Sequence, residues 1–163
     1  MELSRQAAER VVERYIEPRR VDSILGEGKD GIVFSTSSRT AVKLHYRPHT
    51  FRNELAVYRR LKDQRVARVA GFAVPRLLDW EEDELLIEMS WVRPPFILDF
   101  AGAQLDRPFD YPPEIWEHWI QQRAEESGHR WPKVLSLMLI FQRQLGIYHD
   151  DISPRNIRFE NQD

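Results

Sequence analysis

Three polar residues near the end of the chain have types and spacing that suit proton transfer and metal binding. His149, Asp151 and Asn156 form the pattern His-x-Asp-x4-Asn in the stretch HDDISPRN. The Asp151 carboxylate can orient a hydroxyl and accept its proton, and the Asn156 amide oxygen is a hard ligand of the kind that Mg²⁺ binds. The same side chains also suit a polar turn after a helix, with Asp and Asn bonding to nearby backbone. The pattern by itself leaves both interpretations open.

A second motif is the glycine run GEGKDG, in which Gly26, Gly28 and Gly31 follow the spacing G-x-G-x-x-G. The residues after it, IVFSTSSRTAVKL, are β-branched and rich in turn formers, which excludes a dinucleotide-binding loop because that loop precedes a helix. Ile32 stands where a P-loop needs lysine, so that motif is excluded as well. What remains is a hairpin whose backbone N–H groups can close over phosphates, or an ordinary flexible hairpin.

A lysine and a glutamate further along the chain favour the phosphate-binding alternative. In the expected strand TAVKLHY, alternation places Ala41, Lys43 and His45 on one face, although a lysine there also suits an edge strand. In the helix expected at about 49–64, Glu54 falls within the apolar stripe formed by Phe51, Leu55, Tyr58 and Leu61. A carboxylate on a buried helix face is unfavourable unless it is paired, and Lys43 is the nearest candidate cation. A Lys43–Glu54 pair beneath a glycine loop would grip phosphate.

Taken in order, these motifs resemble the protein-kinase-like superfamily. GEGKDGIV is similar to the glycine-rich loop, AVK to the strand lysine motif, FRNELAVYRRL to the helix with the pairing glutamate, LLIEMSWV to the strand that enters the hinge, and HDDISPRN to the catalytic loop. The resemblance covers residues 21–159. Lys43 and Glu54 are only 11 positions apart, which is closer to RIO-type kinases and to aminoglycoside- or choline-type phosphotransferases.

The resemblance implies a role for each matching residue. Lys43, held by Glu54, would bind the α- and β-phosphates of ATP, Asp151 would act as the catalytic base, and Asn156 would bind Mg²⁺. The remaining nucleotide contacts would come from the glycine loop, the strands around it and the hinge, namely Gly26, Gly28, Gly31, Val33, Ala41, Glu88 and Met89.

The expected function is therefore transfer of the γ-phosphate of ATP to a hydroxyl, with Ser or Thr of a protein as the expected acceptor. Asp150 replaces the arginine usual in protein kinases, which leaves a small-molecule kinase as an alternative. The second metal-binding aspartate of an Asp-Phe-Gly motif is missing, and Asp163 is too close to Asn156 for that role. A truncated kinase or a pseudokinase that only binds a nucleotide or a protein is the other alternative. With one carboxylate missing, we expect ATP to bind weakly and with little help from Mg²⁺.

The composition of the chain argues against several other classes of protein and site. The 163 residues include 24 basic and 26 acidic side chains, for a formal net charge of −2, so nucleic-acid binding is not expected. There is no cysteine for a disulfide, a thiolate zinc site or a nucleophile. The longest apolar stretch, VLSLMLIF, is far shorter than the roughly 18 residues of a membrane span, and a cytoplasmic protein is expected.

The order of the helices and strands expected around these residues predicts an α+β, two-lobed kinase-like fold. We expect an N-terminal helix in residues 1–18, an antiparallel-sheet N-lobe with one helix in 19–90, and a shortened helical C-lobe in 91–163 that ends just after the catalytic loop. The helix that contains VLSLMLIF ends at Gly146 and is apolar on all sides, which predicts burial all round. Either the domain is shortened or a protein partner covers that surface.

Overall fold

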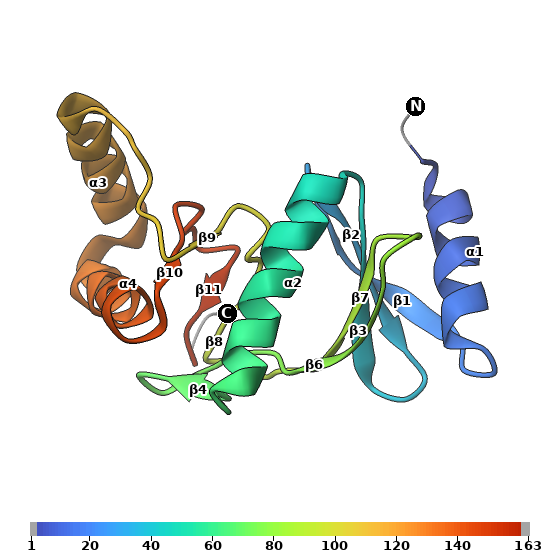
Figure 1. The fold of residues 1–163 in the computed structure, drawn as a ribbon. Helices are drawn as coiled ribbons and strands as arrows, with labels where there is room; N and C mark the ends of the chain where they lie inside the picture. Colours follow the sequence, from blue (N-terminus) through green and yellow to red (C-terminus); the bar gives the residue numbers. More distant parts are fainter. Residues whose placement is uncertain (1–2, 161–163) are drawn as a thin grey trace.

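The computed structural model describes residues 3–160, and its first half is built on a five-stranded antiparallel sheet. The strand order is β1-β2-β3-β7-β6. The elements of this half are α1 (Arg5–Ile16), β1 (Val21–Glu27), β2 (Gly31–Thr36), β3 (Thr40–His45), α2 (Pro48–Asp63), β6 (Leu77–Glu81) and β7 (Leu86–Ser90). Helix α1 covers one face of the sheet and helix α2 covers the other (Figure 1).

Alternation along β3 decides which helix each side chain faces. Val42 and Leu44 pack with α1, in a cluster that includes Ala8, Val12 and Ile16. Ala41 packs in the other cluster, with the apolar stripe of α2. Lys43 and His45 are therefore on the α2 face, as the sequence predicts.

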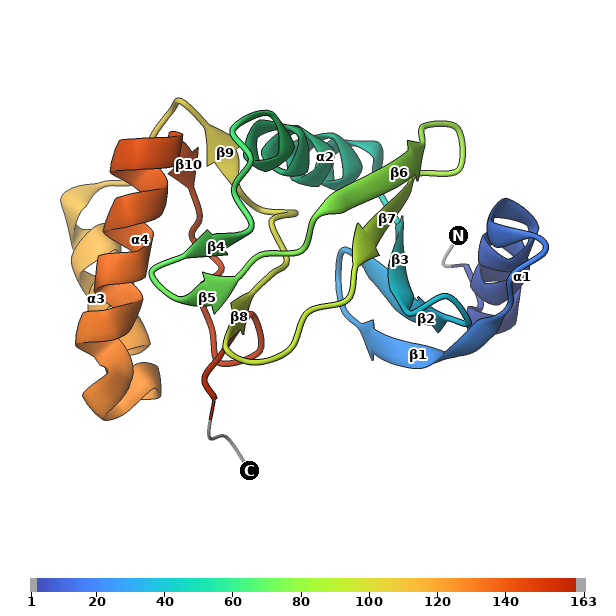
Figure 2. The same cartoon turned by 90° about the horizontal axis from the view of Figure 1, so that it is seen from below.

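The other half of the fold combines helices with very short strands (Figure 2). Its elements are β4 (Arg68–Val69), β5 (Phe72–Ala73), β8 (Phe96–Ile97), β9 (Gln104–Leu105), α3 (Pro113–Ser127), a 3₁₀ turn (Gly128–Arg130), α4 (Trp131–Leu145), β10 (Ile147–Tyr148) and β11 (Ile157–Arg158). Strand β11 pairs antiparallel with β8, and β10 pairs antiparallel with β9. These two pairings hold the loop of residues 149–156, called the 149–156 loop below, beside the segment that follows β8.

Helix α4 has Pro132 in its first turn and ends at Gly146, which adopts the left-handed conformation at φ 65°. One face of the helix is buried, through Val134, Leu137, Met138, Phe141 and Leu145. The prediction of burial on every side is wrong, because Leu135 is 37% exposed. Helix α3 contacts α4 but contributes no buried residue of its own, so it covers the other face of α4 only in part.

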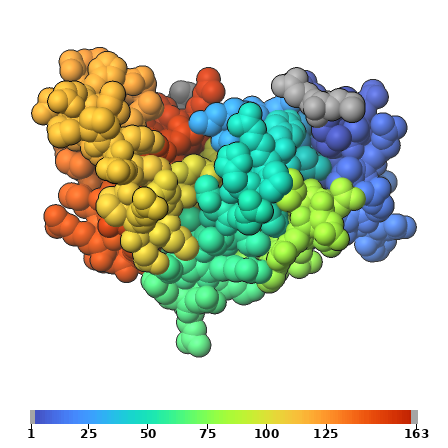
Figure 3. Space-filling model, turned by 45° about the horizontal axis from the view of Figure 1, so that its top comes forward, coloured from blue at the N-terminus to red at the C-terminus, as the bar shows by residue number. Residues whose placement is uncertain are grey.

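The expected α+β architecture, with an antiparallel sheet and a small set of helices, is confirmed. A single core cluster contains residues of α2, β7 and α4, so the two halves share one core. In the space-filling view the segment after β8, in yellow, lies against α2 (Figure 3). Two polar contacts join them: Asn53 donates to the carbonyl of Ala101, and Arg60 forms a salt bridge with Asp106. No helix within residues 3–160 is long and apolar enough to span a bilayer.

Candidate functional site

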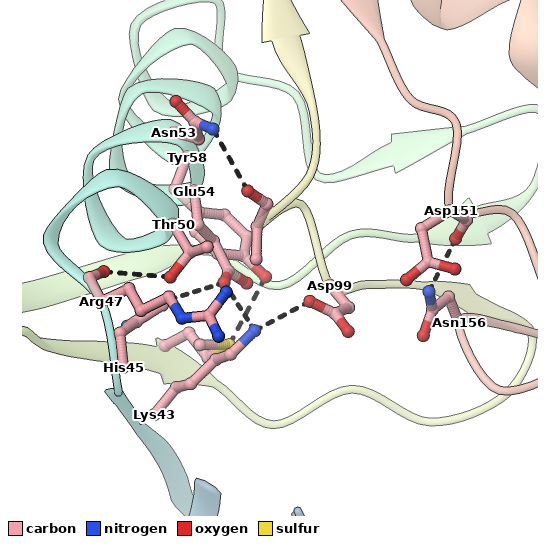
Figure 4. A network of polar contacts seen from close by, with 12 residues as sticks. Lys43, His45, Arg47, Thr50, Asn53, Glu54, Tyr58, Asp99, Asp151 and Asn156 are labelled. Atoms are coloured by element: carbon pink, nitrogen blue, oxygen red, sulfur yellow. Dashed lines mark hydrogen bonds and ion pairs between the residues drawn. The ribbon is translucent and has the colours of Figure 1, made fainter. Parts of the chain in front are cut away.

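The structure brings Lys43 and Glu54 together on the buried face of the sheet (Figure 4). The ammonium nitrogen of Lys43 is 2.6 Å from Oε2 of Glu54, and their side chains are only 6% and 1% exposed. The same carboxylate oxygen lies 2.7 Å from Nε2 of His45, two residues along β3 from Lys43. Glu54 therefore has two partners, and the sequence predicted only one of them.

Both members of the Lys43–Glu54 pair are charged at neutral pH. Burial alone raises the pKa of Glu54, but the charge of Lys43 and the hydrogen bond from His45 outweigh it and lower this pKa to about 2. Burial likewise disfavours the charged form of Lys43, yet the nearby carboxylates of Glu54 and Asp99 raise its pKa above the usual value. The pair is a fixed positive and negative charge beneath the sheet.

Asp99 is a member of the site that sequence reasoning missed. Its Oδ1 atom lies 2.8 Å from Nζ of Lys43, and its side chain is 30% exposed. Figure 4 places Asp99 between Lys43 on one side and Asp151 and Asn156 on the other. Asp99 lies two residues beyond β8, which is paired with β11 on one side and β5 on the other, and these pairings bring it here.

The three glycines of the loop between β1 and β2 have different surroundings. A side chain at Gly26 or Gly28 would meet nothing within 4 Å, so the backbone at these two positions is open to an approaching ligand. A Cβ atom at Gly31 would lie 2.3 Å from the carbonyl oxygen of Leu44. Gly31 is therefore required by the close approach of β2 and β3, whether or not it contacts a ligand.

The residues expected around adenine lie on neighbouring strands. Val33 is paired with Lys43, and Ala41 with Met89, so all four share the face of the sheet that α2 covers. Glu88 lies within β7 and is paired on both sides, with Val42 and Asp79. Because interior strand positions use their backbone groups for the sheet, Glu88 offers the ligand less than the residues beyond the end of β7.

The carboxylate of Glu88 has one partner on the sheet and one outside it. It forms an ion pair with Arg19, just beyond α1, and accepts a hydrogen bond of 2.6 Å from Thr40. This side chain therefore ties the N-terminal helix to the sheet.

In the 149–156 loop, Asp151 and Asn156 are joined by a hydrogen bond. The Asn156 amide nitrogen donates to the backbone carbonyl of Asp151 at 2.7 Å, and Asn156 is 6% exposed. This bond uses the nitrogen end of the amide and leaves its oxygen without a hydrogen-bond donor among residues 3–160. Within the same part of the chain, the Asp151 carboxylate has no hydrogen-bond or ion-pair partner either. Two oxygen-bearing groups are thus available side by side.

Asp150, the neighbour of Asp151, has hydrogen-bond partners of its own. Its carboxylate accepts a hydrogen bond of 2.8 Å from the hydroxyl of Tyr111, and its backbone carbonyl accepts one of 2.9 Å from the indole of Trp119. Asp150 therefore anchors α3 and the segment before it to the loop, while Asp151 is left free for chemistry.

The first residue of the motif, His149, belongs to the core. It is 5% exposed and packs against the ring of Phe100 at 5.4 Å between centroids. Neither ring nitrogen has a hydrogen-bond partner in the described part of the chain. Burial lowers the pKa of His149, and the nearby carboxylates of Asp99 and Asp151 only partly oppose this.

The buried His149 predicts an acid-sensitive stability. Below the ordinary histidine pKa of 6.5, the unfolded chain binds a proton that the folded chain does not, so the free energy of unfolding falls as the pH falls. This single group contributes a slope of at most about 1.4 kcal/mol per pH unit. We expect His149→Leu to flatten the dependence between about pH 6.5 and 5, measured by denaturant unfolding at each pH. Equal slopes in the variant and the wild type would contradict this assignment.

The oxygen groups of the site fit Mg²⁺ by their chemistry. No group of three or more His, Asp or Glu side chains within residues 3–160 is placed to hold a metal ion by itself. Mg²⁺, however, is usually bound by one or two carboxylates together with substrate phosphates and water. The free amide oxygen of Asn156 and the carboxylates of Asp99 and Asp151 would provide such a partial set.

A cavity of about 200 Å³ lies next to the 149–156 loop, away from Lys43. It is lined by residues of the 3₁₀ turn, α4 and the loop itself, including Arg130, Val134, Ser153, Pro154 and Phe159. None of the paired charges described above reaches it. The candidate site is therefore assigned to the region around Lys43, Asp99 and Asp151.

No protein-family model and no curated protein matches the chain. Similar solved structures are the streptomycin–ATP–APH(2'')-IIa ternary complex, the ADP-bound aminoglycoside phosphotransferase APH(2'')-Ib and the gentamicin–APH(2'')-IIa complex, at 15%, 17% and 16% identity. Each has a TM-score of 0.39, and the matches cover 57%, 54% and 57% of this chain but only 30%, 28% and 29% of those chains.

Proposed function

We propose that the site binds ATP and transfers its γ-phosphate to a hydroxyl group. The observation that carries this proposal is the line of groups in Figure 4, from the Glu54-held ammonium of Lys43 through Asp99 to the free carboxylate of Asp151. A buried cation held by a carboxylate is suited to polyphosphate, and the two open glycine positions, Gly26 and Gly28, lie in the hairpin of the same sheet.

In the proposed reaction each group has one task. Lys43 neutralises phosphate charge, and Glu54 and His45 hold it in place. Asp151 orients the acceptor hydroxyl and takes its proton as the new oxygen–phosphorus bond forms. The bond from the γ-phosphorus to the bridging oxygen breaks, and its electron pair leaves with ADP. A divalent cation near Asn156 would neutralise charge on the phosphates.

A small molecule is the acceptor that we propose. Four aromatic side chains stand in a row beside the 149–156 loop, with neighbouring ring centroids 5.4 to 5.5 Å apart: Phe109, Tyr111, Trp116 and Trp119. Two of them bond to Asp150, so the row is fixed next to Asp151. This row of aromatic rings favours a compact acceptor over an extended peptide, because an extended peptide needs an open surface. A protein Ser or Thr is the alternative acceptor.

Ligand-dependent unfolding tests nucleotide binding directly. With Mg²⁺ present, we expect ADP and ATP to raise the midpoint of thermal unfolding, because a ligand at 100 times its Kd stabilises the folded state by about 2.7 kcal/mol. Adenosine is the matched control, since it lacks the phosphates that Lys43 would bind, and it should shift the midpoint much less. The absence of a shift with both ADP and ATP would refute the proposed function.

Acceptor profiling then separates the candidate functions. The protein is incubated with ATP and a panel of amino sugars, amino alcohols and a Ser/Thr-containing peptide mixture, and ADP release is measured. Release that depends on a small hydroxyl compound supports the proposal, and release that depends only on peptides supports the protein acceptor. Nucleotide binding with no acceptor-dependent release would identify a nucleotide-binding module.

A further inference from the structure

The Asp99 carboxylate is bonded to the Lys43 ammonium, the group that a phosphate oxygen would contact. The Lys43 ammonium has two anionic partners, Glu54 at 2.6 Å and Asp99 at 2.8 Å. Glu54 is fully inside the protein, whereas Asp99 is 30% exposed on the side of the 149–156 loop. Of the two sides of the ammonium that carry an anion, the Asp99 side is thus the more open to an incoming phosphate.

The backbone holds Asp99 at this place. The N–H of Leu98 donates to the carbonyl of Asn156 at 2.9 Å, continuing the pairing of Ile97 with Ile157. Asp99 itself adopts the left-handed conformation at φ 65°, which turns the chain at this point. The next residue, Phe100, is fully buried and packs against the ring of Tyr58 at 5.5 Å. These contacts fix the backbone at residue 99, so the Asp99 carboxylate stays in the neighbourhood of Lys43 and of any nucleotide bound there.

We propose that Asp99 makes nucleotide binding dependent on a divalent cation. This inference rests on the proposed function and adds a regulating residue to the same site. Without a cation, the Asp99 carboxylate competes with phosphate for Lys43 and repels it, since Glu54, Asp99 and the phosphate would then share one ammonium. With a cation, the Asp99 carboxylate and the free amide oxygen of Asn156 can share it with the phosphates, as hard oxygen ligands do. The expectation of little help from Mg²⁺ assumed a missing carboxylate, and Asp99 supplies one from another part of the chain.

Isothermal titration of ADP into the intact chain tests this inference, with excess Mg²⁺ in one series and EDTA in the other. For the wild type we expect affinity to be at least about tenfold higher with Mg²⁺. For Asp99→Asn, we expect affinity in EDTA to rise, because Lys43 is released and a negative charge is removed. The ratio between the two conditions should fall below about threefold. Asp63→Asn, which removes an exposed carboxylate at the far end of α2, should keep the wild-type ratio.

Each outcome decides between specific alternatives. A wild-type ratio near one overturns the inference without any variant and leaves the proposed function intact. If Asp99→Asn keeps the wild-type ratio of ADP affinities with Mg²⁺ and in EDTA, the inference is also overturned. An equal loss of ADP affinity in both conditions in Asp99→Asn overturns it as well, because Asp99 would then only position Lys43. If the wild type binds no ADP in either series, the proposed function and the inference both fail.

Discussion

Replacing Lys43 by methionine is expected to lower the free energy of unfolding by about 3 kcal/mol and the affinity for ADP by at least about tenfold. The first effect arises because Glu54, 1% exposed, loses the partner that lowers its pKa to about 2. His45 still donates to the same carboxylate, so the expected destabilisation is at the lower end for a broken buried pair. The second effect follows from the loss of the buried cation. Denaturant unfolding and titration calorimetry measure the two effects separately.

The double variant Lys43→Met/Glu54→Gln separates stability from binding. Glutamine keeps an oxygen that can accept the hydrogen bond from His45 but carries no charge, so most of the lost stability should return. Affinity for ADP should stay as low as in the single variant, since the cation is still absent. Wild-type stability and wild-type ADP affinity in Lys43→Met would show that the pair has neither role.

The local patterns predicted the site residues that lie within regular elements. The two-residue alternation of β3 placed Lys43 on the face that α2 covers, and the helical stripe placed Glu54 opposite it. Both predictions needed only the geometry of one strand and one helix. The same alternation put His45 on this face, so its contact with Glu54 was within reach of the sequence.

Asp99 shows where sequence reasoning stops. It follows a two-residue strand in a segment broken by prolines, and no periodicity marks its direction. Its place depends on the pairing of β8 with β11, two strands separated by about sixty residues that are each too short to be recognised by composition. The burial of α4 was overestimated for a related reason, because a run of apolar residues does not reveal that Leu135 lies on an uncovered face.

The last prediction concerns the catalytic base, and Asp150 provides a neighbouring control. Asp151→Asn should lower kcat for phosphoryl transfer by at least about 100-fold and change the affinity for ADP by no more than about threefold. The asparagine preserves shape, and the bond from Asn156 to residue 151 survives because it is accepted by the backbone carbonyl. Only the capacity to take a proton is lost.

Asp150→Asn should reduce kcat far less. The Asp150 carboxylate accepts the hydroxyl of Tyr111 at 2.8 Å, and an asparagine oxygen can accept the same bond. The contact with Trp119 uses the backbone carbonyl of residue 150 and is unaffected. Both variants are compared under saturating ATP and acceptor, with ADP release as the measurement. If Asp150→Asn proves the more damaging of the two, the proton is taken by Asp150, and the free carboxylate of Asp151 has another role.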